Sequence, residues 1–561
     1  MTGKARLRQV HASPGNCRGV RPDAAWTLPF TKLRSALLRH SWLKRKKLHG
    51  RLRRHLFLRH APGDLMTSAM LPKKKHTAFA RSRIQVNLSP YQDEVDFSPL
   101  DGLEHGDAPL DLVSIADLLR NTFVYPPHSI YRNVKVAGSG FDPAQDMHDN
   151  PRFHYLFQSA LASPRPAADA TDDEELVQTY HRLLCEAADR ATSDMRSPWF
   201  MQSGGKDSTS MAIAVAEVRP DTTCITYLGG REENEIASAR FVARKLGLRH
   251  EALVCDVGRA YDRYLAALPR MPLLTADFAA LSYVDLATEV KAHHGDGIID
   301  ALGADQYFGT PVHNKERLLA LLARDLRLPQ TMFSSRFISH SFPLCFALST
   351  LQMDRFERYF PGSRFSDSEV DGLFGWNIST CSRQRMDTFH ADLDAADSSE
   401  AVRRISLIVV ESAHIAKGMY ASKAMSLRLA YPYCDDQFRD WIFNHVPDDH
   451  LIGPRGVNKV LMRQYIAKHF NELPYVKAKG CFRFDLRGLA KQRFDQVYAF
   501  AEQTSALLPG APQWLLAHRN RLDNKYFASK FYLLAITLPW LLSRMHDTHR
   551  PPVTAIKERV S

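Results

Sequence analysis

The sequence of 561 residues has no paired cysteine motif and no long apolar run. No two of its eight cysteines are close enough for a CxxC pair, which argues against a zinc ribbon or a redox motif. Scattered single cysteines without a clear signal peptide are typical of the reducing cytoplasm. The longest apolar run, residues 531–542, contains Pro539 and falls short of the ~20 residues that span a bilayer. We therefore expect a cytoplasmic protein with no membrane partner.

Acidic residues are almost absent from residues 1–65, which contain 16 Lys and Arg but only Asp23 and Asp64. The rest of the chain holds 58 basic and 59 acidic side chains, so the net charge of +13 describes a basic tail. Such a tail can bind nucleic acid, an anionic membrane or an acidic partner. We favour a disordered extension, or a translation start at Met66 or Met70. The nearly neutral body predicts no nucleic-acid partner.

Alternating apolar strands and amphipathic helices organise the middle of the chain. We expect an N-terminal strand at 83–89, a helix at 110–123 and a linker at 161–172, and then a second helix at 174–192. Strands are expected at 198–202, 224–228 and 297–303, with helices at 209–218 and 234–247. This alternation predicts an α/β fold with a parallel sheet and helices on both faces. After about residue 315 the pattern is mostly helical.

The strongest local signal is the hexapeptide Ser203-Gly204-Gly205-Lys206-Asp207-Ser208, between an apolar strand and an apolar helix. A turn of this kind directs several backbone N–H groups, and the positive end of the helix dipole, at one point. The glycines allow close approach to phosphate, and the serines add hydroxyl donors. Asp207 would repel bare phosphate, so its presence indicates Mg²⁺ between carboxylate and pyrophosphate. The alternative is an ordinary Gly-Gly turn capped by serines.

This hexapeptide resembles the pyrophosphate loop of the ATP pyrophosphatase superfamily, and it is not the GxxxxGK[ST] of a Walker A loop. Further segments resemble asparagine synthetases, and they occur in the order of that family across roughly residues 110–490. They are REENEIASARFVARKLGLRH at 231–250, GIIDALGADQYFG at 297–309, YPYCDD at 431–436, GPRGVNKVLMRQYI at 453–466 and KAKGCFRFDL at 477–486.

The resemblance implies cofactors, site residues and domains. ATP would bind at residues 203–208 and Arg463, Mg²⁺ would bind Asp207 and Asp305, and Lys459 and Asp305 would be catalytic. The implied domains are a tail at 1–65, a reduced, non-catalytic glutaminase-like domain at 66–172, the ATP-dependent amide-forming domain with its helical C-terminal part at 173–545, and a tail at 546–561. Without the resemblance, Lys459 is a solvated helix lysine and Asp305 a turn residue. Lys477 and Lys479 face either phosphate or solvent.

Two departures from asparagine synthetases narrow the function. Glutamine-dependent members begin with Met-Cys, and no Met-Cys occurs here at Met1, Met66 or Met70. The resemblance then implies that glutamine is not hydrolysed and that the amine belongs to the substrate. Where the family usually reads Gly-Glu-Gly or Gly-Tyr-Gly, this chain has an apolar residue, Leu302, which cannot move a proton. Gln306 likewise replaces a common glutamate.

Family members without a glutaminase close rings, as β-lactam synthetases and lasso peptide cyclases do. The pattern most resembles a proteobacterial lasso peptide cyclase of the microcin J25 and capistruin type. This resemblance implies a carbon–nitrogen ligase that forms AMP and pyrophosphate. It would join the N-terminal amine of a precursor peptide to an Asp or Glu side chain, and a leader-peptide protease would act in the same pathway. Other hypotheses remain open: an amidotransferase or β-lactam-type cyclase acting on a small acid, a nucleic-acid modifier and a non-enzymatic scaffold.

Overall fold

The computed structural model describes ten segments of the chain. They are residues 84–90, 95–101, 109–138, 172–229, 235–308, 325–354, 356–357, 362–395, 408–471 and 484–547. All lie in the second of the two compact units of the chain, Phe79–Ser561. The predicted tail at 1–65, the linker at 161–171, Lys477 and Lys479 lie outside the described residues. The predicted domain boundaries at 65, 172 and 545 stay predictions.

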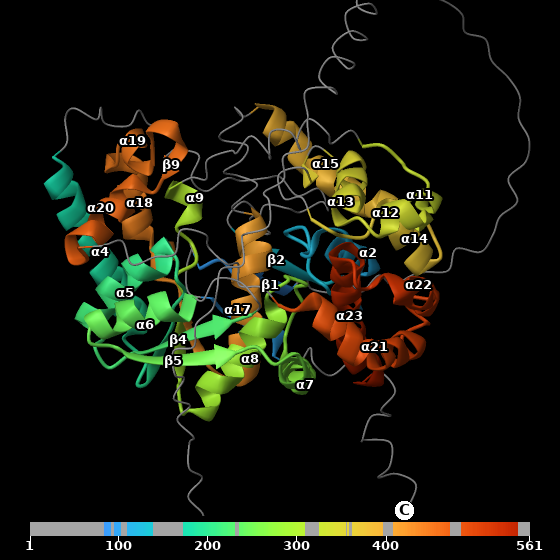
Figure 1. Cartoon of the computed structure of the whole chain (residues 1–561), viewed down its shortest axis with the longest axis horizontal. Coiled ribbons are helices and arrows are strands. Elements are labelled where there is room, and N and C mark those ends of the chain that lie inside the picture. Colours follow the sequence, from blue (N-terminus) through green and yellow to red (C-terminus); the bar gives the residue numbers. More distant parts are fainter. Residues whose placement is uncertain are drawn as a thin grey trace, which may run out of the picture. The chain divides into compact units, whose positions relative to one another are not determined.

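A five-stranded, entirely parallel sheet forms the centre of the fold, in the order β5-β4-β3-β6-β7 (Figure 1). The strands are β3 (Pro198–Met201), β4 (Thr223–Leu228), β5 (Arg249–Val254), β6 (Gly297–Ile299) and β7 (Arg428–Ala430). The predicted α/β fold with a parallel sheet is therefore confirmed. Starting from β3, the chain builds the sheet first towards β5 and later towards β7, so the direction of winding reverses between β3 and β6.

Helices cover both faces of the sheet, as predicted (Figure 1). Helices α5 (Lys206–Val218) and α6 (Glu235–Lys245) belong to the half built first, and α4 (Asp173–Thr192) and α20 (Val460–His469) pack against α5. Helices α7 (Val257–Ala267), α8 (Ala280–Ala292) and α17 (Ala416–Met425) pack against one another. The predicted helices at 174–192 and 234–247 correspond to α4 and α6, and the helix predicted at 209–218 begins earlier, at Lys206.

An N-terminal parallel pair, β1 (Ile84–Asn87) and β2 (Val134–Ala137), lies beside helix α2 (Leu112–Asn121). β1 and α2 match the strand and helix expected at 83–89 and 110–123. The C-terminal part is mostly helical, as predicted. Its helices outside the sheet layers are α9 (Asp305–Phe308), α11 (Gln330–Ser334), α12 (Arg336–Ser339), α13 (Phe342–Leu351), α14 (Asp367–Phe374), α15 (Ser379–Ala395), α18 (Asp436–His445), α19 (Asp448–Leu451), α21 (Leu486–Gln503), α22 (Ala511–His518) and α23 (Lys525–Asp547); the short strands β8 (Ile452–Gly453) and β9 (Val457–Asn458) form an antiparallel pair.

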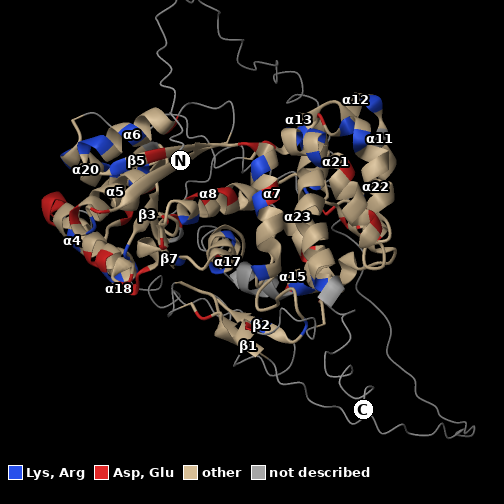
Figure 2. Ribbon diagram, turned by 90° about the horizontal axis from the view of Figure 1, so that it is seen from below, with Lys and Arg blue, Asp and Glu red and all other residues tan. Residues whose placement is uncertain are grey.

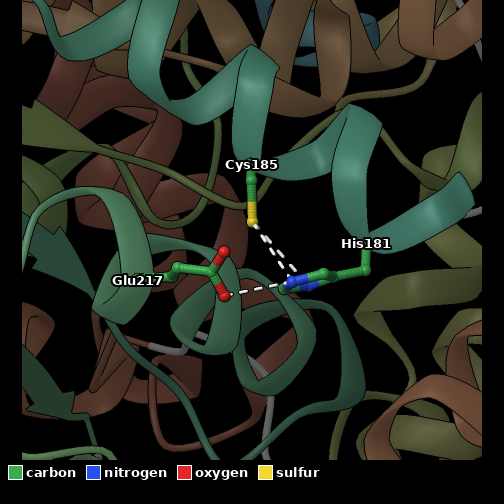
Figure 3. A group of neighbouring side chains, drawn as sticks. All are labelled: His181, Cys185 and Glu217. Atoms are coloured by element: carbon green, nitrogen blue, oxygen red, sulfur yellow. Dashed lines mark hydrogen bonds and ion pairs between the residues drawn. The ribbon is translucent and has the colours of Figure 1, made fainter. Parts of the chain in front are cut away.

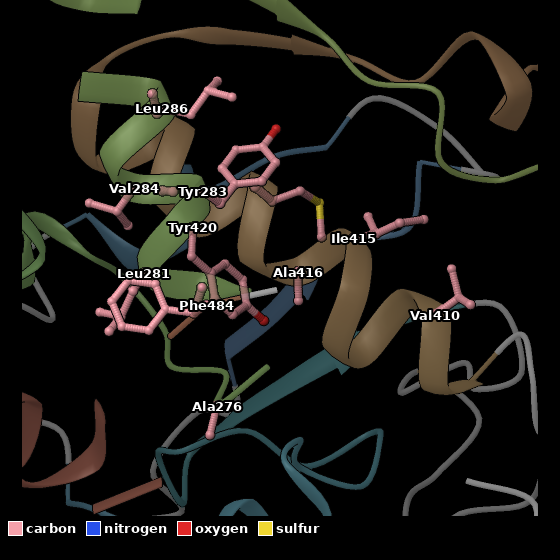
Figure 4. Close-up of a cluster of buried hydrophobic side chains, with 14 of the residues drawn as sticks. Ala276, Leu281, Tyr283, Val284, Leu286, Val410, Ile415, Ala416, Tyr420 and Phe484 are labelled. Atoms are coloured by element: carbon pink, nitrogen blue, oxygen red, sulfur yellow. The ribbon is translucent and has the colours of Figure 1, made fainter. Parts of the chain in front are cut away.

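One large apolar core extends from the N-terminal pair through the sheet to the last helix. The apolar run at 531–542 is the buried centre of α23, and Pro539 lies inside this helix. Buried side chains of α8 also face the helix that runs from Val410 into α17 (Figure 4). None of the described helices has the length and hydropathy to span a bilayer. In the view of Figure 2, basic and acidic residues are interspersed along the helices.

Candidate active site

The turn between β3 and α5 is held by its own side chains. Gly205 is the N-cap of α5, with an extended backbone at φ −93° and ψ 166°. The hydroxyl of Ser208 accepts from the backbone N–H of Ser203 at 3.2 Å and lies 2.9 Å from the Ser203 hydroxyl, which in turn accepts from the N–H of Gly205 at 3.2 Å. The two serines therefore fix the turn before any ligand binds, which lowers the cost of ordering it.

The turn already binds a negatively charged group. The backbone N–H of Gly204 donates to the Glu235 carboxylate at 3.0 Å, from the start of α6. Asp207 and Lys206 occupy the first turn of α5. Free N–H groups and the helix dipole make such a position favourable for phosphate oxygens. The Glu235 contact therefore shows that the N–H of Gly204, within the predicted loop, can bind a negatively charged oxygen.

A second loop follows β6 and carries Asp305. Gly303 has a φ of +120°, and a Cβ at this position would lie 2.9 Å from Sγ of Cys434 and 3.3 Å from the backbone of Tyr433. Only glycine is accommodated without strain or a clash. The strand that we expected over 297–303 ends at Ile299, because the chain must turn here to reach Asp305 at the start of α9.

Lys459 joins the two loops. It is the N-cap of α20, has the left-handed backbone conformation φ 58° and ψ 49°, and is 2% exposed. Its ammonium forms ion pairs with Asp207 and, at 2.5 Å, with Asp305. A left-handed lysine is uncommon and costs backbone energy, so the surrounding structure must hold it in place. Helix α20 begins directly after this residue, at Val460.

Burial and charge act in opposite directions on Lys459. Burial alone lowers the pKa of its ammonium, but the carboxylates of Asp207 and Asp305 raise it further than burial lowers it. The net pKa lies above the ordinary value for lysine, so Lys459 carries a positive charge at neutral pH. Both carboxylates contact the same atom, Nζ of Lys459. Their oxygens therefore lie close enough together to bind one Mg²⁺ ion, which prefers hard oxygen ligands.

The site lies where the winding of the sheet reverses. The loops that carry Asp207 and Asp305 follow the neighbouring strands β3 and β6 at their carboxyl ends. In open α/β sheets, ligands bind in the crevice at this point, because the two loops diverge to opposite faces. The fold therefore explains why two sequence motifs about 100 residues apart meet.

A cavity of about 710 Å³ opens beside these loops, within the range of small-molecule sites. Its polar lining includes Ser203, Asp207, Ser208 and Asp305 from the two loops. Its lining also includes aromatic residues from α13 and from the segment preceding α21: Phe342, Phe346 and Phe484. The ring centroids of Phe342 and Phe346 are 5.7 Å apart. The cavity therefore offers both charged and apolar contacts to a ligand.

Arg463 lies one helical turn after Lys459, and its backbone N–H donates to the Lys459 carbonyl at 3.0 Å. Its Nε donates to the backbone carbonyl of Asn458 at 2.8 Å, and it is not among the described residues that line the cavity. Lys206, half-buried at the start of α5, and Lys459 are likewise outside that lining. Ser203, Ser208, Asp207, Asp305 and Leu302 do line the cavity, and Lys459 is joined to it through its ion pairs with the two aspartates.

Sequence reasoning missed His414, which lines the same cavity. It lies in a π-helical segment, Val410–Ile415, immediately before α17. Single π-helical turns are frequent at functional sites. Its Nε2 is 3.6 Å from Asp277, and the Lys417 ammonium is also 3.6 Å from that carboxylate. Burial lowers the pKa of His414, Asp277 raises it and Lys417 lowers it, with a net decrease, so the ring is neutral near pH 7.

The fold and the site together define a nucleotide-utilising α/β enzyme with a parallel-sheet core. Residues 179–504, more than half of the chain, match the family model for asparagine synthase. The chain therefore belongs to the asparagine synthase family, with its ATP pyrophosphatase-like fold, and it is an ATP-utilising carbon–nitrogen ligase.

Solved structures with similarity to the chain include three synthetases. NMN synthetase from Francisella tularensis is 12% identical over 44% of this chain and 96% of that chain, with a TM-score of 0.21. NH3-dependent NAD synthetase from Campylobacter jejuni is 12% identical over 43% and 96%, with a TM-score of 0.19. NAD+ synthetase from Burkholderia pseudomallei is 15% identical over 41% and 93%, with a TM-score of 0.17. No curated protein matches the chain.

Proposed function

We propose that this enzyme closes a macrolactam in a ribosomal peptide, as in lasso peptide maturation. An Asp or Glu side chain of the precursor peptide would be activated as an acyl-adenylate and attacked by the peptide's N-terminal amine. The observation that carries the ATP-dependent step is the convergence of Asp207 and Asp305, which line the cavity, on the ammonium of Lys459. A protease of the same pathway would first remove the leader peptide, and we place both reactions in the cytoplasm.

The first step would form the adenylate. An oxygen of the peptide carboxylate attacks the α-phosphorus of ATP, and the bond between this phosphorus and the bridging oxygen to the β-phosphate breaks, releasing pyrophosphate. The turn from Ser203 to Ser208 would hold the phosphates, with a phosphate oxygen replacing the Glu235 carboxylate at the N–H of Gly204. Mg²⁺, bound to Asp207 and Asp305, would neutralise charge on the leaving pyrophosphate.

The second step would form the amide. The amine nitrogen attacks the acyl carbon, and the bond between this carbon and the oxygen that bridges it to phosphorus breaks. AMP leaves with that bridging oxygen, and the nitrogen loses one proton. Lys459 remains charged, so its ammonium can stabilise the oxyanion that develops on the acyl group. Removing one such donor commonly lowers rates by about 10²–10³-fold. Tethering amine and acid in one peptide also reduces the entropic cost of their encounter.

His414 is the group that we propose accepts the proton of the amine. A general base must be unprotonated at the working pH and must face the reacting groups. His414 is neutral near pH 7 and opens into the cavity, whereas Leu302 on the acidic loop has no group that can accept a proton. An α-amine, with a pKa of about 7.7–8.0, also needs less help than a lysine amine.

The peptide part of the proposal rests on the cavity and on the sequence. Phe342, Phe346 and Phe484 also line the cavity and can contact apolar side chains of a peptide. The sequence also offers no Met-Cys from which glutamine-derived ammonia would come.

Mass spectrometry with a linear peptide tests the proposal. The peptide should have a free N-terminus and an Asp or Glu several residues inside, and ATP and Mg²⁺ should be present. We expect loss of one water from the peptide with release of AMP, and no reaction when the N-terminus is acetylated. Cyclisation of the acetylated peptide, or incorporation of ammonia into the carboxyl group, would favour an amidotransferase instead.

A further inference from the structure

Three potential metal ligands meet between α4 and α5, apart from the residues of the candidate active site. His181 and Cys185 are four positions apart on α4, so both face the same side of that helix. Glu217 comes from the last turn of α5. One ligand atom of each lies within 4.8 Å of the others. The sulfur, the ring nitrogens and the carboxylate point towards one another (Figure 3). We call this group the α4–α5 cluster.

The distances within the α4–α5 cluster are close to those of a zinc site. Nε2 of His181 is 3.0 Å from Oε2 of Glu217 and 3.9 Å from Sγ of Cys185. Tetrahedral zinc, with bonds of about 2.3 Å to sulfur and about 2.0–2.2 Å to nitrogen and oxygen, needs roughly 3.4–3.6 Å between such ligands. The two distances from Nε2 are within about half an ångström of these values, and all three ligand atoms lie within 4.8 Å of one another. Thiolate, imidazole and carboxylate together form a ligand set that zinc uses.

A buried tyrosine orients the histidine. The hydroxyl of Tyr465, on α20, is 2.8 Å from Nδ1 of His181. Metal-binding histidines commonly use their second nitrogen for such a hydrogen bond, which fixes the ring and its tautomer. In the tautomer whose Nδ1–H donates to Tyr465, Nε2 keeps the lone pair that a metal needs. Sγ of Cys185 lies 3.7 Å from Nδ1 and 3.9 Å from Nε2, so the imidazole must turn for Nε2 and the thiolate to bind one ion.

The burial of the three residues also suits metal entry. Cys185 is 8% exposed, whereas the side chains of His181 and Glu217 are 28% and 60% exposed. The sulfur is therefore shielded, and the carboxylate side is open to water, which can supply the fourth ligand. The ring of His469, at the end of α20, is 5.9 Å from that of His181 and borders this side.

We propose that His181, Cys185 and Glu217 bind a Zn²⁺ ion that ties α4 to α5. Binding replaces the thiol proton of Cys185, which passes to solvent. The ion would also act on the active site from the far ends of two helices. Helix α5 begins at the phosphate-binding turn and ends at Glu217, and α20 begins just after Lys459 and carries Tyr465. The site would stabilise the arrangement of both helices without touching the substrate.

Co²⁺ titration of the full chain, purified free of metal, tests this proposal. A thiolate ligand gives cobalt a sulfur-to-metal charge-transfer absorption, which carboxylates such as Asp207 and Asp305 cannot produce. We expect this band to saturate at one Co²⁺ per chain, to be displaced by Zn²⁺ and to be unaffected by Mg²⁺. Zn²⁺ should also raise the unfolding temperature of the wild-type chain.

Variants identify the ligands and separate binding from folding. Cys185→Ser should abolish the band, Glu217→Gln should weaken Co²⁺ binding at least tenfold, and Tyr465→Phe should weaken it 10–100-fold as a positioning residue. Cys255→Ser, a half-buried cysteine elsewhere, and Glu186→Gln, on the exposed side of α4, should bind normally. A band that persists in Cys185→Ser, or no band with wild-type protein that folds normally, would overturn the zinc site and leave a hydrogen-bonded packing cluster.

Discussion

Tyr433 donates a hydrogen bond of 3.1 Å to the backbone carbonyl of Asp207, across 226 positions of sequence. Burial raises the pKa of this phenol well above its usual value, so Tyr433 is a neutral donor at any physiological pH. The bond fixes the first turn of α5 against the YPYC turn after β7. Tyr433 therefore fixes the backbone of Asp207, and Lys459 fixes its carboxylate.

The two aspartates should be needed for the adenylation step. Asp207→Asn or Asp305→Asn keeps the shape of the side chain but removes the charge that binds Mg²⁺ and pairs with Lys459. We expect exchange of labelled pyrophosphate into ATP, measured with peptide present, to fall at least 100-fold. Asp495→Asn, whose side chain is 87% exposed, is the matched control and should exchange normally. Normal exchange by either aspartate variant would remove that residue from the site.

Lys459 should affect the rate more than the binding of ATP. Its ammonium would meet charge that develops in the transition state, so its loss lowers kcat with little change in ground-state affinity. Lys459→Ala should reduce ring closure by roughly 10²–10³-fold and leave ATP affinity within a few fold. Lys459→Arg should rescue poorly, because a planar guanidinium does not replace a compact ammonium. Lys468→Ala, on the exposed side of the same helix, is the control, and an equal loss there would point to damage of α20.

His414 should produce an acid limb in the pH profile. Burial lowers its pKa, so the neutral, proton-accepting form predominates at pH 7 and is lost only as the pH falls through that lowered value. We expect His414→Gln to lower kcat by roughly 10²-fold and to remove this limb. His445→Gln, an exposed histidine on α18, should keep both rate and profile. If the acid limb of the pH–rate profile stayed unchanged in His414→Gln, another group would accept the proton of the amine.

A buried ion pair should contribute strongly to stability. The ammonium of Lys530, on α23, lies 2.7 Å from both oxygens of Glu369, on α14, and is 1% exposed. Lys530→Met leaves a buried carboxylate without its partner, so we expect the free energy of unfolding in urea to fall by about 3–5 kcal/mol. The double variant Lys530→Met, Glu369→Leu removes both charges and should recover most of that loss. A double variant as unstable as the single one would contradict this account.

Within the five-stranded sheet, the inner strands with continuous apolar residues were predictable from the sequence, and the edge strands were not. Of the N-terminal pair, β1 was predicted and β2 was missed. The strands β3, β4 and β6 lie inside the sheet and have almost fully buried side chains. The strand β5 forms one edge of the sheet, and most of its side chains are exposed, so buried and exposed positions do not alternate clearly. The strand β7 has only three residues. Neither has the apolar run that marks a strand, so both were missed. Their place in the sheet comes from backbone pairing with a neighbour, which local sequence does not encode.

The motifs predicted which residues meet, but not how each is held. Gly204, Gly205 and Gly303 indicated the two loops from sequence alone, because close approach of the backbone or a positive φ requires glycine. The left-handed backbone of Lys459 and the π-helical turn of His414 gave none, since both depend on tertiary packing. The position of Arg463 could not be read either, because its side chain bonds to Asn458 within the same local turn.

The spacing of the site along the chain has a consequence for synthesis on the ribosome. Lys459 follows Asp207 by 252 positions, which corresponds to roughly 13–50 s of translation at 5–20 residues per second. In the part of this interval after Asp305 has been made, the nascent chain holds both aspartates without their cationic partner. It also has β6 at an open edge, because β7 has not yet emerged. Open strand edges favour pairing between chains. Protection of the nascent chain until β7 and α20 have left the ribosome should therefore matter more for the yield of active enzyme than the stability of the finished fold.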